Sequence, residues 1–181
     1  MAANKRLLFI FTVLLFLITG PLYAQYLAVN VKADPALKIF VNGNLDFSKY
    51  YGVIVAGLGT LSIPKENGTV IKVKGNAKKG KFGQCIEAEL VLENNMQIYL
   101  RNGKARIPLT VGWAYKDGNN IVDISSKTVS PIIPLYPEGN SAWWSAYLYI
   151  HGKLENYDSS IPPGHYRGNI LVKIEQRTCN Y

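Results

Sequence analysis

The order of apolar and polar residues predicts β-strands along most of the chain. The clearest example is the last segment, residues 164–181, where Ile170, Val172 and Ile174 point to one face and mostly charged side chains point to the other. Side chains alternate across a strand, so this segment is predicted to be a strand whose apolar face lines a core. Because chain ends fray unless something holds them, we expect pairing within a sheet to hold this terminus.

Short alternating runs of the same kind recur from residue 26 onward, and turns rich in glycine, asparagine and proline separate them. Valine, isoleucine, threonine and tyrosine are abundant, and no segment has a helical pattern. This pattern is typical of an all-β protein, either a sandwich or a barrel. The predicted strands before the last one are 26–32, 37–41, 45–47, 51–56, 60–63, 69–74, 84–92, 96–101, 105–115, 121–124 and 142–152. Segments 127–140 and 156–164 are predicted to be loops.

The first 24 residues have the pattern of a secretory signal peptide. Lys5 and Arg6 precede an apolar run from Leu7 to Thr19, and Ala24 ends a plausible cleavage site. The run of about 13 residues is shorter than the roughly 20 that a membrane-spanning helix needs. We therefore expect export to the periplasm, cell surface or medium, with cleavage after Ala24. The mature chain, 25–181, has no integral membrane segment and no internal repeat or linker, so it is predicted to form one domain.

The chain has two cysteines, Cys85 and Cys179, and in an exported protein such a pair usually forms a disulfide. Closing a loop of about 95 residues would stabilise the fold by roughly 4–5 kcal/mol on the chain-entropy model. The bridge would also join the last strand to a strand in the middle of the chain. The alternative is a pair of free thiols.

The formal net charge is +8, and the cations are spread along the chain. The densest group is a set of five lysines: Lys72, Lys74, Lys78, Lys79 and Lys81. Such a group suits an anionic partner such as an acidic polysaccharide or a nucleic acid. The glycines in the same segment favour a solvated strand end and hairpin loop instead. We expect no nucleic-acid partner.

The sequence contains no recognisable enzyme motif or metal-binding spacing. Glu87 and Glu89 share a strand face, but such a pair is usually solvated. His151 and His165 flank a loop that contains Asp158, and we expect a structural or exposed role for both. The chain is therefore not expected to be an enzyme or to bind a cofactor.

Trp143 and Trp144 are adjacent in a predicted strand, so their side chains point to opposite faces. One is expected in the core. The other is a candidate for stacking on a sugar or contacting a partner, and the alternative is that it packs under the proline-rich loop.

Three segments together resemble a known family. Leu45–Phe47 followed by 53–63 (VIVAGLGTLSI), 74–82, and 149–174 (YIHGKLENYDSSIPPGHYRGNILVKI) are similar, respectively, to the beginning, the glycine-rich middle and the end of a bacterial pilin-like secreted family related to fimbrial and spore-coat-U-type subunits. Gly168 also matches the glycine that chaperone–usher pilins carry fourteen places from their end. The resemblance implies an immunoglobulin-like β-sandwich exported across the inner membrane.

The resemblance also implies assembly by strand donation. An N-terminal strand of one subunit would complete the sheet of a neighbour after displacing a periplasmic chaperone. The donor would be Tyr26–Lys32, with Leu27, Val29 and Val31 filling pockets of an identical or related subunit. The alternative is that this segment is the first strand of its own domain. The corresponding functions are a structural or adhesive subunit of a surface appendage or matrix, and a self-complete module that binds a glycan or a surface.

Overall fold

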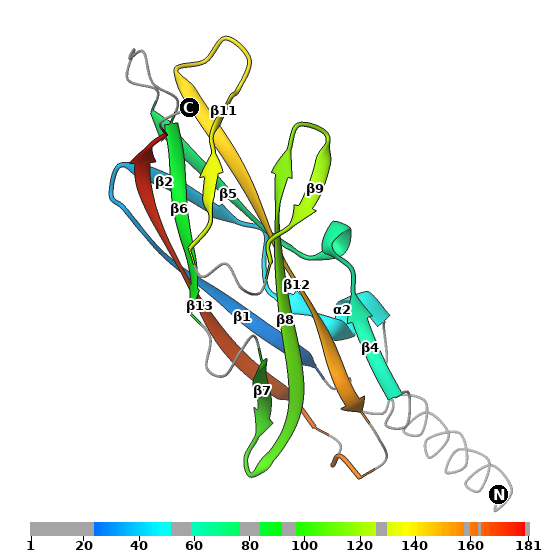
Figure 1. The fold of residues 1–181 in the computed structure, drawn as a ribbon. Helices are drawn as coiled ribbons and strands as arrows, with labels where there is room; N and C mark the ends of the chain where they lie inside the picture. Colours follow the sequence, from blue (N-terminus) through cyan, green and yellow to red (C-terminus); the bar gives the residue numbers. More distant parts are fainter. Residues whose placement is uncertain are drawn as a thin grey trace, which may run out of the picture.

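β-Structure dominates the chain, and the all-β class predicted from the alternating pattern is confirmed (Figure 1). The computed structural model describes residues 24–51, 59–76, 84–91, 97–125, 130–157, 160–162 and 164–179. The predicted signal peptide lies outside these residues apart from Ala24. The strands are β1 (Gln25–Ala33), β2 (Leu37–Val41), β3 (Leu45–Asp46), β4 (Gly59–Ile63), β5 (Thr69–Asn76), β6 (Gln84–Val91), β7 (Gln97–Asn102), β8 (Ala105–Asp117), β9 (Asn120–Asp123), β10 (Ile132–Pro134), β11 (Tyr136–Pro137), β12 (Trp143–Tyr157) and β13 (Tyr166–Thr178).

These thirteen strands form a single mixed sheet that curls strongly around one core. The main order is β10-β6-β13-β7-β8-β12-β5-β2, and β1 lies beside β13. β7 connects the two halves, because it pairs with β8 along its length and with β13 at Arg101 and Arg167. This pairing does not establish the two-sheet sandwich that the family resemblance implies. The chain is a single all-β domain with the form of a half-barrel.

β12 is the central strand of one half of the sheet. Its residues 143–150 pair with β5 and residues 152–157 with β4, while β8 and β11 occupy its other edge. The side chains of Ala146, Leu148, Ile150 and Leu154 are buried in the core. The outward side chains of the same strand therefore come to lie beside those of β5 and β8.

β13 organises the other half. It pairs with β6 on one edge and runs parallel to β1 on the other, from Gln25 opposite Tyr166 to Ala33 opposite Ile174. Ile170, Val172 and Ile174 are at most 3 % exposed. Leu27 of β1 is fully buried, and Val29 and Val31 are partly buried against the same core. In this chain, the segment proposed as a donor strand is thus the first strand of its own sheet.

Gly168 has a packing role in this pairing. It lies opposite Leu27, and a Cβ atom placed on it would be 2.8 Å from a methyl carbon of Leu100 and 3.1 Å from one of Leu27. The missing side chain leaves the space that these two leucines fill. A side chain at this position would therefore displace Leu100 and press on Leu27.

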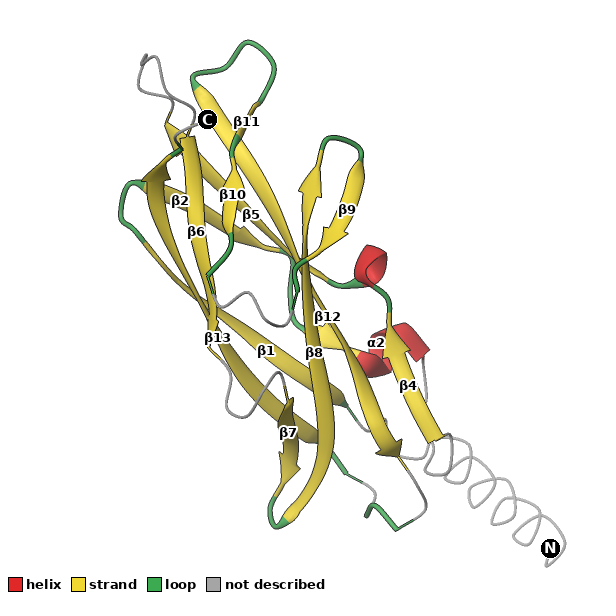
Figure 2. Cartoon of the chain, in the orientation of Figure 1, coloured by secondary structure: helices red, strands yellow, loops and turns green. Residues whose placement is uncertain are grey.

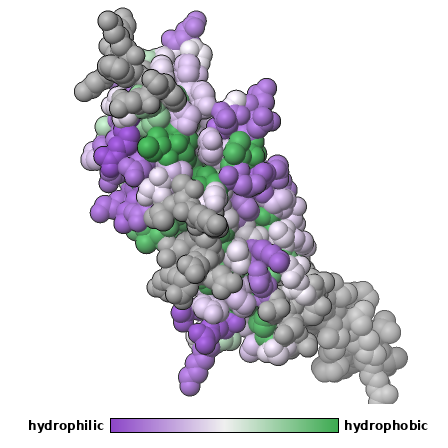
Figure 3. Space-filling model, in the orientation of Figure 1, coloured by the Kyte–Doolittle hydropathy of each residue, from purple (hydrophilic) through white to green (hydrophobic). Residues whose placement is uncertain are grey.

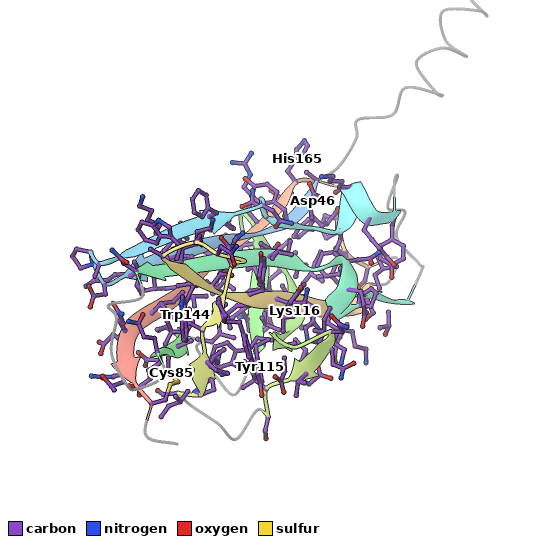
Figure 4. The ribbon with its side chains drawn as sticks, turned by 90° about the horizontal axis from the view of Figure 1, so that it is seen from above. Asp46, Cys85, Tyr115, Lys116, Trp144 and His165 are labelled. Carbon is purple, nitrogen blue, oxygen red and sulfur yellow. A yellow bond between two sulfur atoms is a disulfide. The ribbon has the colours of Figure 1, made fainter. Side chains whose placement is uncertain are left out.

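The disulfide between Cys85 and Cys179 is present, as predicted (Figure 4). It joins β6 to the residue after β13, with Cα atoms 5.6 Å apart and 94 positions apart in sequence. The end of the terminal strand is thereby bound to its neighbour in the sheet. Disulfides persist in oxidising compartments.

Two segments differ from the sequence prediction (Figure 2). The sequence predicted strands at 45–47 and 51–56, but Phe47–Tyr51 forms a short helix, α2. The carboxylate of Asp46 accepts a hydrogen bond from the Lys49 N–H at 3.0 Å, which caps this turn, and Phe47 is buried beneath it. A second short helix, η1, spans Lys65–Asn67. No helix in the described ranges is long and apolar enough to cross a membrane.

The predicted loop 127–140 contains two short strands, β10 and β11. Ile133 pairs with Ile86 of β6, and Leu135, between the two strands, is also buried. The prolines stand at every third position, 131, 134 and 137, and the residues between them retain N–H groups for pairing. The prediction of a loop here, which rested on the proline content, was therefore wrong for residues 132–134 and 136–137.

Replacing Leu27 with alanine should lower the free energy of unfolding by about 2–5 kcal/mol, because it removes a fully buried side chain from the contact between β1 and β13. Lys32→Ala on the exposed face of β1 is the matched control and should change it by less than about 0.5 kcal/mol. Denaturant titration of both variants measures this. Equal, small effects would show that β1 does not belong to the core.

Replacing both cysteines with alanine should also destabilise the domain, by about 2–5 kcal/mol, because the long loop between them is no longer closed in the unfolded chain. Chemical denaturation of the variant and of the oxidised parent gives the difference. Reducing agent should destabilise only the parent. An unchanged midpoint in the variant would contradict a structural role for the bridge.

Candidate functional site

The outward face of β2, β5 and β12 carries alternating aromatic and lysine side chains. Lys38, Lys74 and Ser145 lie opposite one another across these three strands, and Phe40, Lys72 and Tyr147 form the next such row. Directly paired residues project from the same face of a sheet. We call the set Lys38, Phe40, Lys72, Lys74, Lys116, Trp143 and Tyr147 the aromatic–lysine face.

The lysines of this face lie over its rings. The Nζ of Lys38 is 4.3 Å from the centre of a Trp143 ring, and the Nζ of Lys72 is 5.1 Å from that of Tyr147. Lys116 reaches Tyr147 from β8, at 5.7 Å. Phe40 is 54 % exposed, with Lys74 at 6.0 Å. These cation–π contacts hold the ammonium groups beside apolar surface that is open to solvent.

Glu138 is held against two lysines of this face. It follows β11, whose pairing with β12 places it over the outward side of the sheet. Its carboxylate forms ion pairs with Lys72 and with Lys74, the latter at 2.6 Å. Hydrogen bonds from Lys72 and Lys74 lower the pKa of Glu138 to about 2, and the bond to Glu138 raises the pKa of Lys72. Glu138 therefore fixes the two ammonium groups while Lys38 and Lys116 stay free of it.

The two tryptophans differ in their surroundings. Trp144 packs against the core, and Trp143 lies outward under Lys38 (Figure 4 labels Trp144 and Lys116). Both are partly buried. Trp143 is thus the one that contributes to the outward face. Of the predicted lysine cluster, Lys72 and Lys74 belong to this face, and the other three lysines lie outside the described residues.

The structure does not bring the two histidines together. His151 on β12 packs on Gly112 of β8, where an added Cβ would lie 2.4 Å from the imidazole. Its Nε2 is 3.6 Å from the carboxylate of Asp123, and burial lowers its pKa. His165 precedes β13, and its Nδ1 accepts a hydrogen bond from the Ala24 N–H at 3.0 Å. Asp158 lies outside the described residues.

Glu87 and Glu89, the remaining candidates for acid–base chemistry, each form an ion pair with a cation. Glu87 and Glu89 form ion pairs across to β13, with Arg177 at 2.7 Å and Lys173 at 2.9 Å. In the described ranges, no group of three or more metal-binding side chains occurs. Glu155, on β12, accepts a hydrogen bond from the Thr110 hydroxyl at 3.0 Å.

Sequence reasoning found Trp143 and two of the lysines but missed Lys38, Phe40, Tyr147 and Glu138. Lys38, Phe40 and Tyr147 lie on outward strand positions, which the alternation indicates, whereas Glu138 lies just after β11 in the segment predicted as a loop. They lie far apart in sequence, however, and only the pairing of β2 with β5 and β5 with β12 brings them together. Strand order was not available from the sequence pattern.

Glu138→Gln should remove part of the acid sensitivity of the fold. The folded-state pKa of Glu138 is about 2, below its ordinary 4.5, so its ion pairs contribute stability above pH 4.5 that is lost as the pH falls toward 2. The contribution of such a partly exposed pair is about 0.5–1 kcal/mol. Unfolding free energies of parent and variant should differ at pH 6 and converge near pH 2. A difference that does not change with pH would contradict these ion pairs.

Comparison with known proteins leaves the family open. No family model matches the sequence, and no curated protein matches it. What the structure establishes is an all-β protein with one large curled mixed sheet.

Proposed function

We propose that this protein is an exported, self-complete β-module that binds glycans of a surface or matrix through the aromatic–lysine face. The observation that carries the proposal is the grouping of Trp143, Tyr147 and exposed Phe40 with lysines on one outward face. Aromatic rings offer flat apolar surface to the C–H face of a sugar, and ammonium groups attract its acidic substituents.

Three features support an exported and self-complete domain. The first 24 residues have the pattern of a signal peptide. The disulfide suits an oxidising compartment. β1 pairs with one edge of β13 within its own chain, which supports a domain that completes its own sheet. The proposed module therefore acts as a single folded unit.

A subunit of a pilus-like polymer, with a pilin-like sandwich completed by a neighbour, is the second candidate. One observation favours it: β1 pairs with β13 over nine residues, but with β3 over only two, Tyr26 and Leu27, among the described strands. An element at the end of the chain and held mainly along one edge is suited to exchange between subunits. Exchanged subunits would migrate as a ladder in unheated gel samples that collapses after boiling.

The proposed function predicts that Trp143→Ala and Phe40→Ala each weaken glycan binding about fivefold or more, since a stacked ring contributes about 1 kcal/mol. A glycan array identifies the ligand, and calorimetry measures its Kd for each variant. Tyr50→Ala removes an exposed ring from α2, outside this face, and should leave binding unchanged. A silent array with folded protein, or equal Kd values for all variants, would reject the proposal.

A further inference from the structure

Three arginines form a row across adjacent strands at the opposite end of β8. Arg167 of β13 lies directly opposite Arg101 of β7, and Arg101 lies directly opposite Arg106 of β8. All three are exposed and project from the same face. Since neighbouring strands are about 4.8 Å apart, the row is about 10 Å long. We call it the arginine row.

Stability does not explain this arrangement. Like charges directly opposite one another on neighbouring strands are destabilising. Across the described part of the chain, no carboxylate lies within ion-pair distance of any of the three guanidinium groups. Glu87 and Glu89, by contrast, are each matched with a cation on β13. The arginine row thus concentrates unneutralised positive charge that an external anion would neutralise.

Two tyrosines hold the outer guanidinium groups in place. The guanidinium carbon of Arg106 is 5.0 Å from the ring centre of Tyr99, and that of Arg167 is 5.5 Å from that of Tyr26. Such contacts orient a guanidinium group and leave its edge free to donate hydrogen bonds. Each contact covers one face of its ring.

A groove of about 450 Å³ adjoins the arginine row. Its lining includes Arg101, Arg167 and Tyr99, and the amide-bearing Asn30 and Asn169. Amides both donate and accept hydrogen bonds, as sugar hydroxyls do. The groove is large enough for a small sugar, and its charged rim lies where an acidic substituent would project.

We propose that Arg101, Arg106 and Arg167 bind the sulfate or carboxylate groups of an acidic polysaccharide whose sugar occupies this groove. Guanidinium groups bind such oxyanions through two parallel hydrogen bonds. The site is separate from the aromatic–lysine face, because Arg106 and Lys116 are ten positions apart on β8, about 33 Å along the strand. It lies near the β7–β8 hairpin at the lower end of Figure 1, where Figure 3 shows hydrophilic residues gathered.

The test uses the mature full-length chain with sulfated dextran, polygalacturonate and uncharged dextran as probes. Replacing all three arginines with glutamine should weaken binding of at least one acidic probe by more than about tenfold, the loss of one or more charge-assisted hydrogen bonds. Replacing them with lysine keeps the charge but not the paired donors, so binding should weaken several-fold. Whichever acidic probe binds more tightly identifies the substituent.

Control variants distinguish binding at the arginine row from attraction by net charge and from binding at the aromatic–lysine face. Lys32, Lys49 and Lys153 are exposed cations outside the arginine row, and their joint replacement by glutamine should leave binding within about twofold. The arginine-to-glutamine variant should be at least as heat-stable as the parent, because like-charge repulsion has been removed. Phe40→Ala reports on the aromatic–lysine face, so a loss of acidic-probe binding that is larger in the arginine variant than in Phe40→Ala assigns the probe to the arginine row.

Several results would overturn the proposal. Equal losses of affinity for the acidic probe in the lysine control and in the arginine variant would show that net charge alone attracts the probe. Full binding by the arginine-to-lysine variant would exclude recognition by guanidinium groups. Equal binding of uncharged dextran would exclude an oxyanion site. Binding of poly(U) RNA that is tighter than that of both acidic probes and lost in the arginine-to-glutamine variant would assign the row to nucleic acid.

Discussion

The parallel pairing of the first strand with the last is the contact on which the fold depends. β1 supplies Leu27 to a core that Ile170, Val172 and Ile174 line from β13, and Gly168 leaves the space for that leucine. Burial of these side chains and the ladder of hydrogen bonds bring the two ends of the chain together. The disulfide then fixes the far end of β13 to β6. The aromatic–lysine face and the arginine row both lie on the outward side of the curled sheet that the pairing of β1 with β13 completes.

The apolar alternation predicted most strands because burial of one sheet face imposes a period of two. It placed β1 and β13 correctly, and the cysteine pair joined the right two strands. It did not predict α2, because Asp46 caps that turn through a side-chain hydrogen bond that leaves no periodic pattern. It also missed β10 and β11, where proline content suggested a loop. Whether β1 pairs within its chain was undecided, because periodicity does not identify a strand's partner.

The same limit applies to the two surfaces. Trp143 stood out by residue type, but Lys38 and Tyr147 became neighbours only through strand order. Arg101 and Arg106 are joined by a hairpin that the sequence predicted, whereas Arg167 reaches them from the far end of the chain. Both surfaces combine cations with aromatic rings, and they differ in chemistry. Lysine ammonium groups beside open rings suit sugars of varied charge, whereas guanidinium groups in a row suit oxyanions.

The central claim is that β1 completes the domain of its own chain. Hydrogen–deuterium exchange of the mature protein, measured at low and high protein concentration with the molar mass recorded by light scattering, tests it most directly. The account predicts a monomer in which the amides of residues 26–33 are protected equally at both concentrations. Fast exchange of these amides in the monomer, with protection appearing only in oligomers, would contradict the account and favour strand exchange between subunits.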